Sequence, residues 1–127
     1  MDESLQASLL IIDDSSTNIR LLNNLLEDLN YQISSARSGQ QALQLLNKLN
    51  PDVILLDIKM PEMSGFDCCK AIRKHPNGKN VPVIFLSGSN GYDDELMAKE
   101  VGGSDYLTKP ISRNVLIEKI NFYLPWG

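Results

Sequence analysis

Cysteine is scarce in this chain, and the two that occur stand next to each other. Cys68 and Cys69 are the only cysteines among 127 residues. On a helix, neighbouring side chains point about 100° apart, and a bond between adjacent cysteines would strain the backbone. We therefore expect no structural disulfide, which fits a reducing compartment. Core packing explains both thiols better than redox chemistry does.

Long apolar runs and an excess of basic residues are also absent. No apolar run approaches the roughly 20 residues that span a bilayer, and the start of the chain, Met1 to Ser4, is acidic where a signal peptide would be basic. The 16 acidic residues outnumber the 12 basic ones, which gives a net charge of -4 and disfavours nucleic acid and anionic membranes as direct partners. We expect a cytoplasmic protein that binds neither nucleic acid nor membrane directly.

What is present is the composition of one ordinary globular domain. Of the 127 residues, 43% are hydrophobic and 22% are charged, a balance that is typical of a folded core rather than of disorder. The length suits a single domain, which we expect to span residues 1–127. The last three residues, 125–127, are Pro-Trp-Gly and have the character of a linker that begins there.

Three short apolar runs and a fourth, shorter strand each end at a polar side chain. The run Val53 to Leu56 does not alternate, which indicates a strand covered on both faces of a parallel sheet, and Asp57 follows it. A buried helix is the alternative, but Asn50-Pro51 before the run and Met60-Pro61 after it leave room for only a few residues. The other runs are Leu9 to Ile12 before Asp13 and Asp14, Val81 to Leu86 before Ser87, and the short strand Asp105 to Thr108 before Lys109.

Apolar residues at helical spacing occupy the segments between these strands. Most of these segments begin with a serine suited to capping, and these serines are Ser15 or Ser16, Ser38, Ser64 and Ser112. The last helix is expected to carry its apolar side chains at Val115, Leu116, Ile120 and Leu124. A weaker strand at Tyr31 to Ala36 alternates like a sheet edge. The alternation predicts a doubly wound α/β domain with five parallel strands and right-handed crossovers.

The polar residues that follow the runs are expected to converge, because the carboxyl ends of parallel strands meet at one edge of a sheet. They are Asp13, Asp14, Asp57, Ser87 and Lys109. Crowded carboxylates repel one another unless their pKa values rise or a cation neutralises them. Oxygen ligands without a histidine or thiolate suit Mg²⁺. Such an ion and the amine would stabilise charge on a transferring phosphoryl group, for which a carboxylate can serve as nucleophile.

As a set, these motifs resemble the receiver domain of response regulators in two-component signalling, the CheY-like superfamily. The resemblance covers nearly the whole chain. It rests on Asp13-Asp14 after the first strand, Asp57 with Met60-Pro61 and Gly65 after the third, Ser87 after the fourth and Lys109-Pro110 after the fifth. It implies a flavodoxin-like fold with the strand order 2-1-3-4-5.

The resemblance implies a phosphoacceptor and a metal site among the acids. Asp57 matches the residue that takes up the phosphoryl group. Asp14 matches an acid that binds Mg²⁺ directly, and Asp13 matches one that often acts through a water. The main-chain carbonyl of Lys59 matches a further ligand after Asp57. The expected cofactor is therefore Mg²⁺, bound by Asp13, Asp14, Asp57 and Lys59.

The resemblance also assigns the hydroxyl and the amine. Ser87 matches the hydroxyl that bonds the phosphoryl group, although threonine is commoner there, and Gly88 stands where alanine is common. Lys109 matches the amine that pairs with the phosphoryl group, and a cis peptide at Lys109-Pro110 is implied, which would aim the lysine inward. Tyr106 matches the aromatic switch position.

The implied function is a signalling switch rather than an enzyme. The chain would be a phosphoacceptor that assists its own Mg²⁺-dependent phosphorylation and autodephosphorylation. Its donor would be a histidine kinase or a histidine phosphotransfer protein. The signal would leave through the fourth helix, the fifth strand and the fifth helix, towards a downstream protein, an output domain or a phosphorylation-dependent dimer.

Two other classes of function compete. A small-molecule phosphatase that forms an aspartyl-phosphate would also use an Asp at a strand end with Mg²⁺. Such enzymes resemble D-x-D around the nucleophile, whereas residue 59 here is lysine. A flavodoxin-like nucleotide-binding module would need a phosphate cradle, and the chain contains neither G-x-G-x-x-G nor a P-loop. Both rank below the switch.

Overall fold

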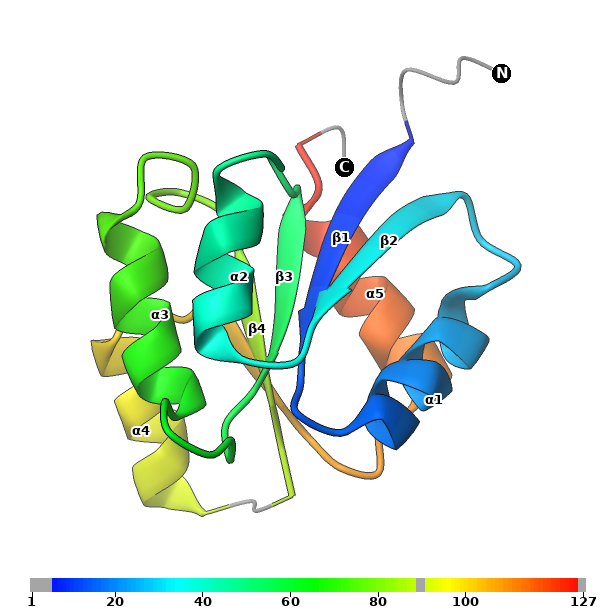
Figure 1. Ribbon diagram of the computed structural model, residues 1–127. Helices are drawn as coiled ribbons and strands as arrows, with labels where there is room; N and C mark the ends of the chain where they lie inside the picture. The colour runs from blue at the N-terminus through cyan, green and yellow to red at the C-terminus, as the bar shows by residue number, and fades with distance from the viewer. Residues whose placement is uncertain (1–5, 89–90, 126–127) are drawn as a thin grey trace.

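A parallel β-sheet runs through the centre of the molecule (Figure 1). The computed structural model describes residues 6–88 and 91–125, and within them five strands alternate with five helices. The strands are β1 (Ala7–Ile12), β2 (Tyr31–Ala36), β3 (Val53–Asp57), β4 (Val83–Ser87) and β5 (Asp105–Thr108). The helices are α1 (Ser16–Leu26), α2 (Gly39–Leu46), α3 (Gly65–Lys74), α4 (Tyr92–Glu100) and α5 (Arg113–Tyr123). The sheet order β2-β1-β3-β4-β5 confirms the predicted fold.

Both ends of the chain and part of the loop after β4 lie outside the described residues. Met1 to Ser4, Trp126 and Gly127 of the linker-like end, and Ser89 with Asn90 are among them. Within residues 6–88 and 91–125, none of the helices has the length and apolar character needed to cross a bilayer.

Helices cover both faces of the sheet, so the central strands are buried on two sides. On one face lie α2, α3 and α4, from which Leu46, Ile72 and Ala98 pack onto the sheet (Figure 1). On the other lie α1 and α5, which contribute Leu26 and Leu116. Successive side chains of β1, β3 and β4 alternate between these two cores. Because both faces are buried, the sequences of the central strands are unbroken apolar runs.

Serine side chains begin four of the helices, as predicted. The hydroxyls of Ser15, Ser38, Ser64 and Ser112 accept hydrogen bonds from main-chain N–H groups three residues on, at 3.2, 3.1, 3.2 and 3.5 Å. The exception is α4, which begins after Gly91 without a side-chain cap and buries Ala98. The carbonyl of Gly91 accepts a 3.3 Å hydrogen bond from the N–H of Glu95 at this end of the helix.

Two details of the elements differ from the prediction. β4 begins at Val83 rather than Val81 and continues through Ser87. The carbonyl of Val81 instead accepts a 2.6 Å hydrogen bond from Nη1 of Arg73, and Pro82 has no N–H for the sheet ladder. In α5, Val115 is 42% exposed, because the buried stripe runs through Leu116 and Ile120, one helical turn apart.

The two cysteines are free and buried in α3. Burial raises the pKa of the Cys68 thiol to about 12, with a smaller contribution from Cys69. Burial also raises the pKa of Cys69, whose Sγ donates to the carbonyl of Val101 at 3.4 Å. Since the thiolate is the reactive form, both side chains serve as packing groups.

Candidate functional site

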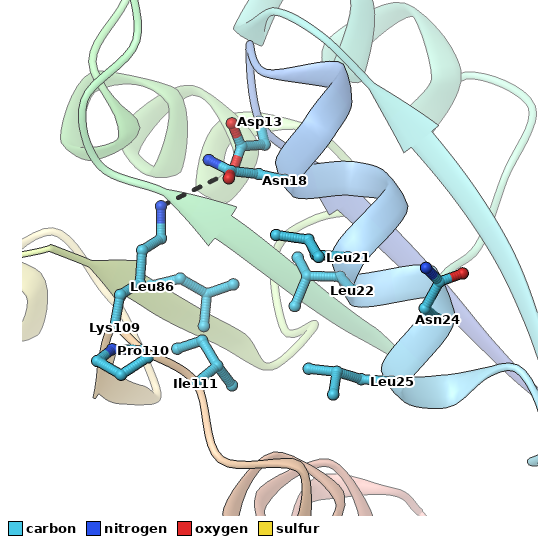
Figure 2. Close-up of a pocket in the computed structure, with 10 residues that line it drawn as sticks. All are labelled: Asp13, Asn18, Leu21, Leu22, Asn24, Leu25, Leu86, Lys109, Pro110 and Ile111. Atoms are coloured by element: carbon cyan, nitrogen blue, oxygen red, sulfur yellow. Dashed lines mark ion pairs between the residues drawn. The ribbon is translucent and has the colours of Figure 1, made fainter.

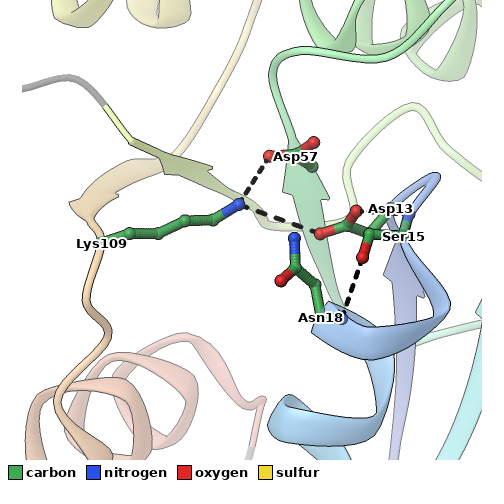
Figure 3. Close-up of polar contacts among 5 residues, drawn as sticks. All are labelled: Asp13, Ser15, Asn18, Asp57 and Lys109. Carbon is green, nitrogen blue, oxygen red and sulfur yellow. Dashed lines mark hydrogen bonds and ion pairs between the residues drawn. The ribbon is translucent and has the colours of Figure 1, made fainter.

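Polar residues from four strands meet at one edge of the sheet, as the sequence predicts. Asp13 comes directly after β1, Asp57 and Ser87 are the last residues of β3 and β4, and Lys109 comes directly after β5. Figure 3 shows the carboxylates of Asp13 and Asp57 facing the Lys109 ammonium. Parallel pairing of β1 with β3, β3 with β4 and β4 with β5 brings these ends together.

Three carboxylates form a tight cluster here. One oxygen from each of Asp13, Asp14 and Asp57 lies within 4.8 Å of the others. Asp13 is 1% exposed and Asp57 is 6% exposed, whereas Asp14 is half-buried. The Nζ atom of Lys109 lies 3.0 Å from Asp57 Oδ1 and 4.0 Å from Asp13 Oδ2. One ammonium thus contacts two acids of a three-acid cluster, which leaves an excess of negative charge when all three are ionised.

In the part of the chain that the structure describes, one oxygen of this cluster is buried without a hydrogen bond. Asp13 Oδ1 accepts a 2.9 Å bond from the N–H of Ser15, but Asp13 Oδ2 has no such partner within residues 6–88 and 91–125. The 4.0 Å separation from Lys109 allows an ion pair and is too long for a hydrogen bond. Since a buried oxygen without a partner is costly, a cation would be stabilised here. The oxygen donors fit Mg²⁺.

Burial raises the pKa of Asp57 above the usual value of an aspartate. The hydrogen bond from Lys109 acts in the opposite direction, while the charge of Asp13 and, more weakly, that of Asp14 raise the pKa further. The ionised form of Asp57 is therefore costly in the folded chain. A cation bound beside it would lower that cost.

The loop after β5 is fastened directly to the end of β4. The N–H of Lys109 donates to the carbonyl of Ser87 at 2.6 Å, and Ser87 pairs with Thr108 in the sheet register. The Lys109-Pro110 peptide is cis, as the resemblance implied. Ser87 is 3% exposed. The hydroxyl-bearing residue and the amine-bearing residue are thus held side by side.

Two further predicted residues lie outside the acid cluster. Lys59 lies two residues beyond Asp57, in the loop between β3 and α3, with its side chain exposed; a role for its carbonyl as a metal ligand stays a prediction. Tyr106 pairs with Phe85 in the sheet and packs against the core on the α2, α3 and α4 face. It also lines a small cavity with Lys99 of α4. Tyr106 therefore lies beside α4 rather than among the carboxylates.

Sequence reasoning missed two residues that border this cluster. Asn18 lies in the first turns of α1, and Figure 3 shows its side chain beside Asp13. Arg37 follows β2 and donates two hydrogen bonds to the main-chain carbonyl of Asp14. Its position could have indicated Arg37, since this residue also lies directly after the carboxyl end of a parallel strand. It was overlooked because β2 is a half-exposed edge strand without an apolar run.

An apolar groove leads to the carboxylates between α1 and the loop after β5. Figure 2 shows this cavity of about 450 Å³, with Asp13 and the Lys109 ammonium at one end. Its apolar walls are Leu21, Leu22, Leu25, Leu86, Pro110 and Ile111. Leu21 is 56% exposed. The acids are therefore approached across an apolar surface on this side.

Comparison with known families decides what kind of domain carries this site. Residues 9–121 match the sequence model of the response regulator receiver domain. The chain belongs to this family. Receiver domains are phosphorylation-controlled signalling switches, so the predicted class of function is confirmed. The alternative small-molecule phosphatase has no support among the comparisons.

Relatives and a solved structure agree with this assignment. The chain is 35% identical over 118 residues to protein PilH of Pseudomonas aeruginosa, which covers 93% of this chain and 98% of PilH. It is 40% identical over 124 residues to a probable cyclic di-GMP phosphodiesterase of Vibrio cholerae, covering 98% of this chain but only 28% of that relative's length. A solved structure of the receiver domain of the sensor histidine kinase PA1611 from Pseudomonas aeruginosa contains magnesium in its active site cleft. It superposes on this chain with a TM-score of 0.85 at 27% sequence identity. The match covers 93% of this chain and 97% of that one.

Proposed function

We propose that Asp57 accepts a phosphoryl group from a phosphohistidine on a histidine kinase or a histidine phosphotransfer protein. The observation that carries this proposal is the buried Asp57 carboxylate 3.0 Å from the Lys109 ammonium, at the centre of the acid cluster. A carboxylate oxygen of Asp57 attacks phosphorus, the bond from phosphorus to the donor nitrogen breaks, and the imidazole leaves with the electron pair. Lys109 and the hydroxyl of Ser87 then bind the phosphoryl oxygens.

The nucleophile must be ionised at neutral pH, although burial opposes this. Lys109 supplies the opposing effect, because its hydrogen bond and its charge both lower the pKa of Asp57. We assign Asp13, Asp14, Asp57 and the carbonyl of Lys59 as the groups that would hold Mg²⁺. The ion would supply positive charge that neutralises the acids and the phosphoryl oxygens. The ion and Lys109 together would then balance the charge of the three acids.

The apolar groove beside α1 supports docking of the donor protein on this side. A donor histidine must come within bonding distance of Asp57, and the groove wall reaches from Asp13 and Lys109 to Leu21. We propose that an apolar face of the donor packs on Leu21 while its phosphohistidine points at Asp57. The reaction would follow in the cytoplasm, where the two free thiols would stay reduced.

Leu21→Glu is expected to slow transfer from a phosphohistidine protein about tenfold, the equivalent of roughly 1.4 kcal/mol in binding. Labelling by acetyl phosphate should be unchanged, because this small donor does not need the groove. Leu96→Glu is the matched control, since Leu96 is an exposed leucine of α4 on the other face of the sheet. Equal slowing with both donors would argue against docking at Leu21.

We propose that the downstream partner binds a surface formed by α4, β5 and α5, which we call the output surface. Five of the six large apolar side chains that the described residues expose lie on α4 and α5, and they are Tyr92, Leu96, Met97, Val115 and Phe122. The phosphoryl group would draw the hydroxyl of Ser87 inward, and Tyr106 would move beneath α4. A downstream protein, an output domain or a second copy of the chain that prefers one state would read the change.

Backbone NMR of the chain with beryllofluoride and Mg²⁺ tests this switch. We expect shift changes around Asp57 and Ser87 that extend to Tyr106, Lys99 and Lys119. In Ser87→Ala, the changes near Asp57 should persist while those at Tyr106 and Lys99 shrink, because the connecting hydroxyl is gone. Changes confined to the surroundings of Asp57 in the wild-type chain would refute the output route.

We also propose that residues 1–127 form one receiver domain. The continuous sheet from β1 to β5 supports a single unit. The 28% coverage of the Vibrio cholerae relative is consistent with a receiver domain joined to further domains, whereas PilH is covered almost completely.

A further inference from the structure

Arg37 braces the acidic turn after β1 from a neighbouring loop. Its guanidinium donates two hydrogen bonds to the main-chain carbonyl of Asp14, from Nε at 3.3 Å and from Nη2 at 3.1 Å. Asp13 is held by other groups, because its N–H donates to the carbonyl of Ala36 at 3.0 Å and its Oδ1 accepts from Ser15. The two adjacent acids are thus fixed by different neighbours, and Arg37 fixes Asp14.

The main chain of Arg37 is itself hydrogen-bonded to the start of α2. Its N–H donates to Oε1 of Gln41 at 2.7 Å, and the N–H of Gln41 donates to the hydroxyl of Ser38 that caps α2. A guanidinium is planar and presents its donors in a fixed fork, unlike the ammonium of lysine. Hydrogen bonds through Arg37 therefore link the main chain of Asp14 to the start of α2.

We propose that Arg37 is a positioning residue for the metal site, which holds Asp14 where its carboxylate shares a cation with Asp13 and Asp57. This inference rests on the proposed function, in which Asp14 is a ligand of Mg²⁺. The half-buried Asp14 lies within 4.8 Å of the other two acids. Groups that orient metal ligands through hydrogen bonds typically change metal affinity about tenfold or more when they are removed.

Charge alone gives the opposite expectation. Arg37 is a cation bonded to a residue of the metal site, so its loss would strengthen Mg²⁺ binding if only Coulomb repulsion mattered. Its loss weakens Mg²⁺ binding if the hydrogen bonds to Asp14 matter more. The two accounts differ in the sign of the change, and an affinity measurement separates them.

The test is a calorimetric Mg²⁺ titration of the wild-type chain and three variants. Arg37→Met is expected to weaken binding about tenfold. Arg37→Lys should recover part of this loss, because an ammonium still donates one hydrogen bond to the Asp14 carbonyl. Arg20→Met removes the same charge from an exposed position on α1 and should bind Mg²⁺ like the wild type. Melting temperatures in EDTA should stay close together, since Arg37 is also exposed.

Two outcomes overturn the inference. One is an Arg37→Met affinity equal to or tighter than that of the wild type. The other is labelling of Arg37→Met by acetyl phosphate that stays deficient at saturating Mg²⁺, because a residue that acts only through Asp14 as a metal ligand is compensated by excess metal. A wild-type chain that binds no Mg²⁺ would overturn the proposed metal site itself, so the two failures are distinguishable.

Discussion

Asp57→Asn is expected to abolish the phosphoryl labelling that the wild-type chain undergoes with acetyl phosphate and Mg²⁺. The substitution keeps the size of the side chain and replaces the carboxylate by a neutral amide, which is a poor nucleophile. Of the three clustered acids, Asp57 is the one whose oxygen makes a hydrogen bond with the Lys109 ammonium. We expect a fall of at least about a hundredfold, equivalent to roughly 2.7 kcal/mol in activation free energy, measured by intact-protein mass spectrometry.

Asp67→Asn is the matched control for this variant. Asp67 is an exposed acid in the first turn of α3, so its substitution removes the same charge outside the cluster. It should label like the wild type, and EDTA should suppress labelling of both. Undiminished labelling of Asp57→Asn would show that another residue is the acceptor.

Asp57→Asn is also expected to change the stability of the folded chain. Because burial raises the pKa of Asp57, the ionised carboxylate destabilises the folded chain at neutral pH. This cost disappears as the pH falls through the folded-state pKa towards the value near 3.9 of an unfolded chain. In metal-free buffer, the stability of Asp57→Asn relative to the wild type should therefore be greater at pH 7 than at pH 4.5. Chemical unfolding at both pH values measures it, and a difference of the opposite sign would contradict the buried charge.

Local pattern was sufficient to predict the residues at the strand ends. Val53 to Leu56 is buried on both faces, and Asp57 follows because the run stops at the edge of the sheet. Once the strands were expected to be parallel, the convergence of Asp13, Asp57 and Lys109 required only the rule that their carboxyl ends share an edge. The sequence therefore predicted which residues meet, together with the strand order that the resemblance implied.

Contacts between loops were beyond this reasoning. The hydrogen bonds from Arg37 to Asp14 join residues 23 positions apart, and no periodicity records which loop atom a guanidinium reaches. Among the described residues, Asp13 Oδ2 has no hydrogen-bond partner because Nζ of Lys109 lies 4.0 Å away rather than about 3 Å. Val115 was misplaced for a related reason, since both it and Leu116 are apolar and only packing selects which one faces the sheet.

Gly65→Ala is expected to destabilise the chain by about 3 kcal/mol, at the upper end of overpacking costs. A Cβ at this first residue of α3 would lie 2.2 Å from the carbonyl oxygen of Asp57 and 2.8 Å from Cα of Ile58. Both are main-chain atoms, so no side-chain rotation relieves the clash, and the 2.7 Å hydrogen bond from the N–H of Gly65 to the carbonyl of Ile58 would be strained. Helix propensity favours alanine by only about 1 kcal/mol. Thermal unfolding should show a fall of about 10 °C.

Gly88→Ala provides the contrasting control at the same edge of the sheet. Among the residues that the structure describes, a Cβ on Gly88 would meet nothing within 4 Å. The loss of backbone freedom in the unfolded chain would favour alanine by about 0.4–1 kcal/mol. The two substitutions add the same methyl group. Opposite signs of their effects on stability would therefore isolate the contribution of the close approach between α3 and the main chain of Asp57. Since the clash acts on the main chain of Asp57, Gly65→Ala should also label more slowly with acetyl phosphate at temperatures where it stays folded. Equal melting temperatures for Gly65→Ala and the wild type would contradict this tight packing.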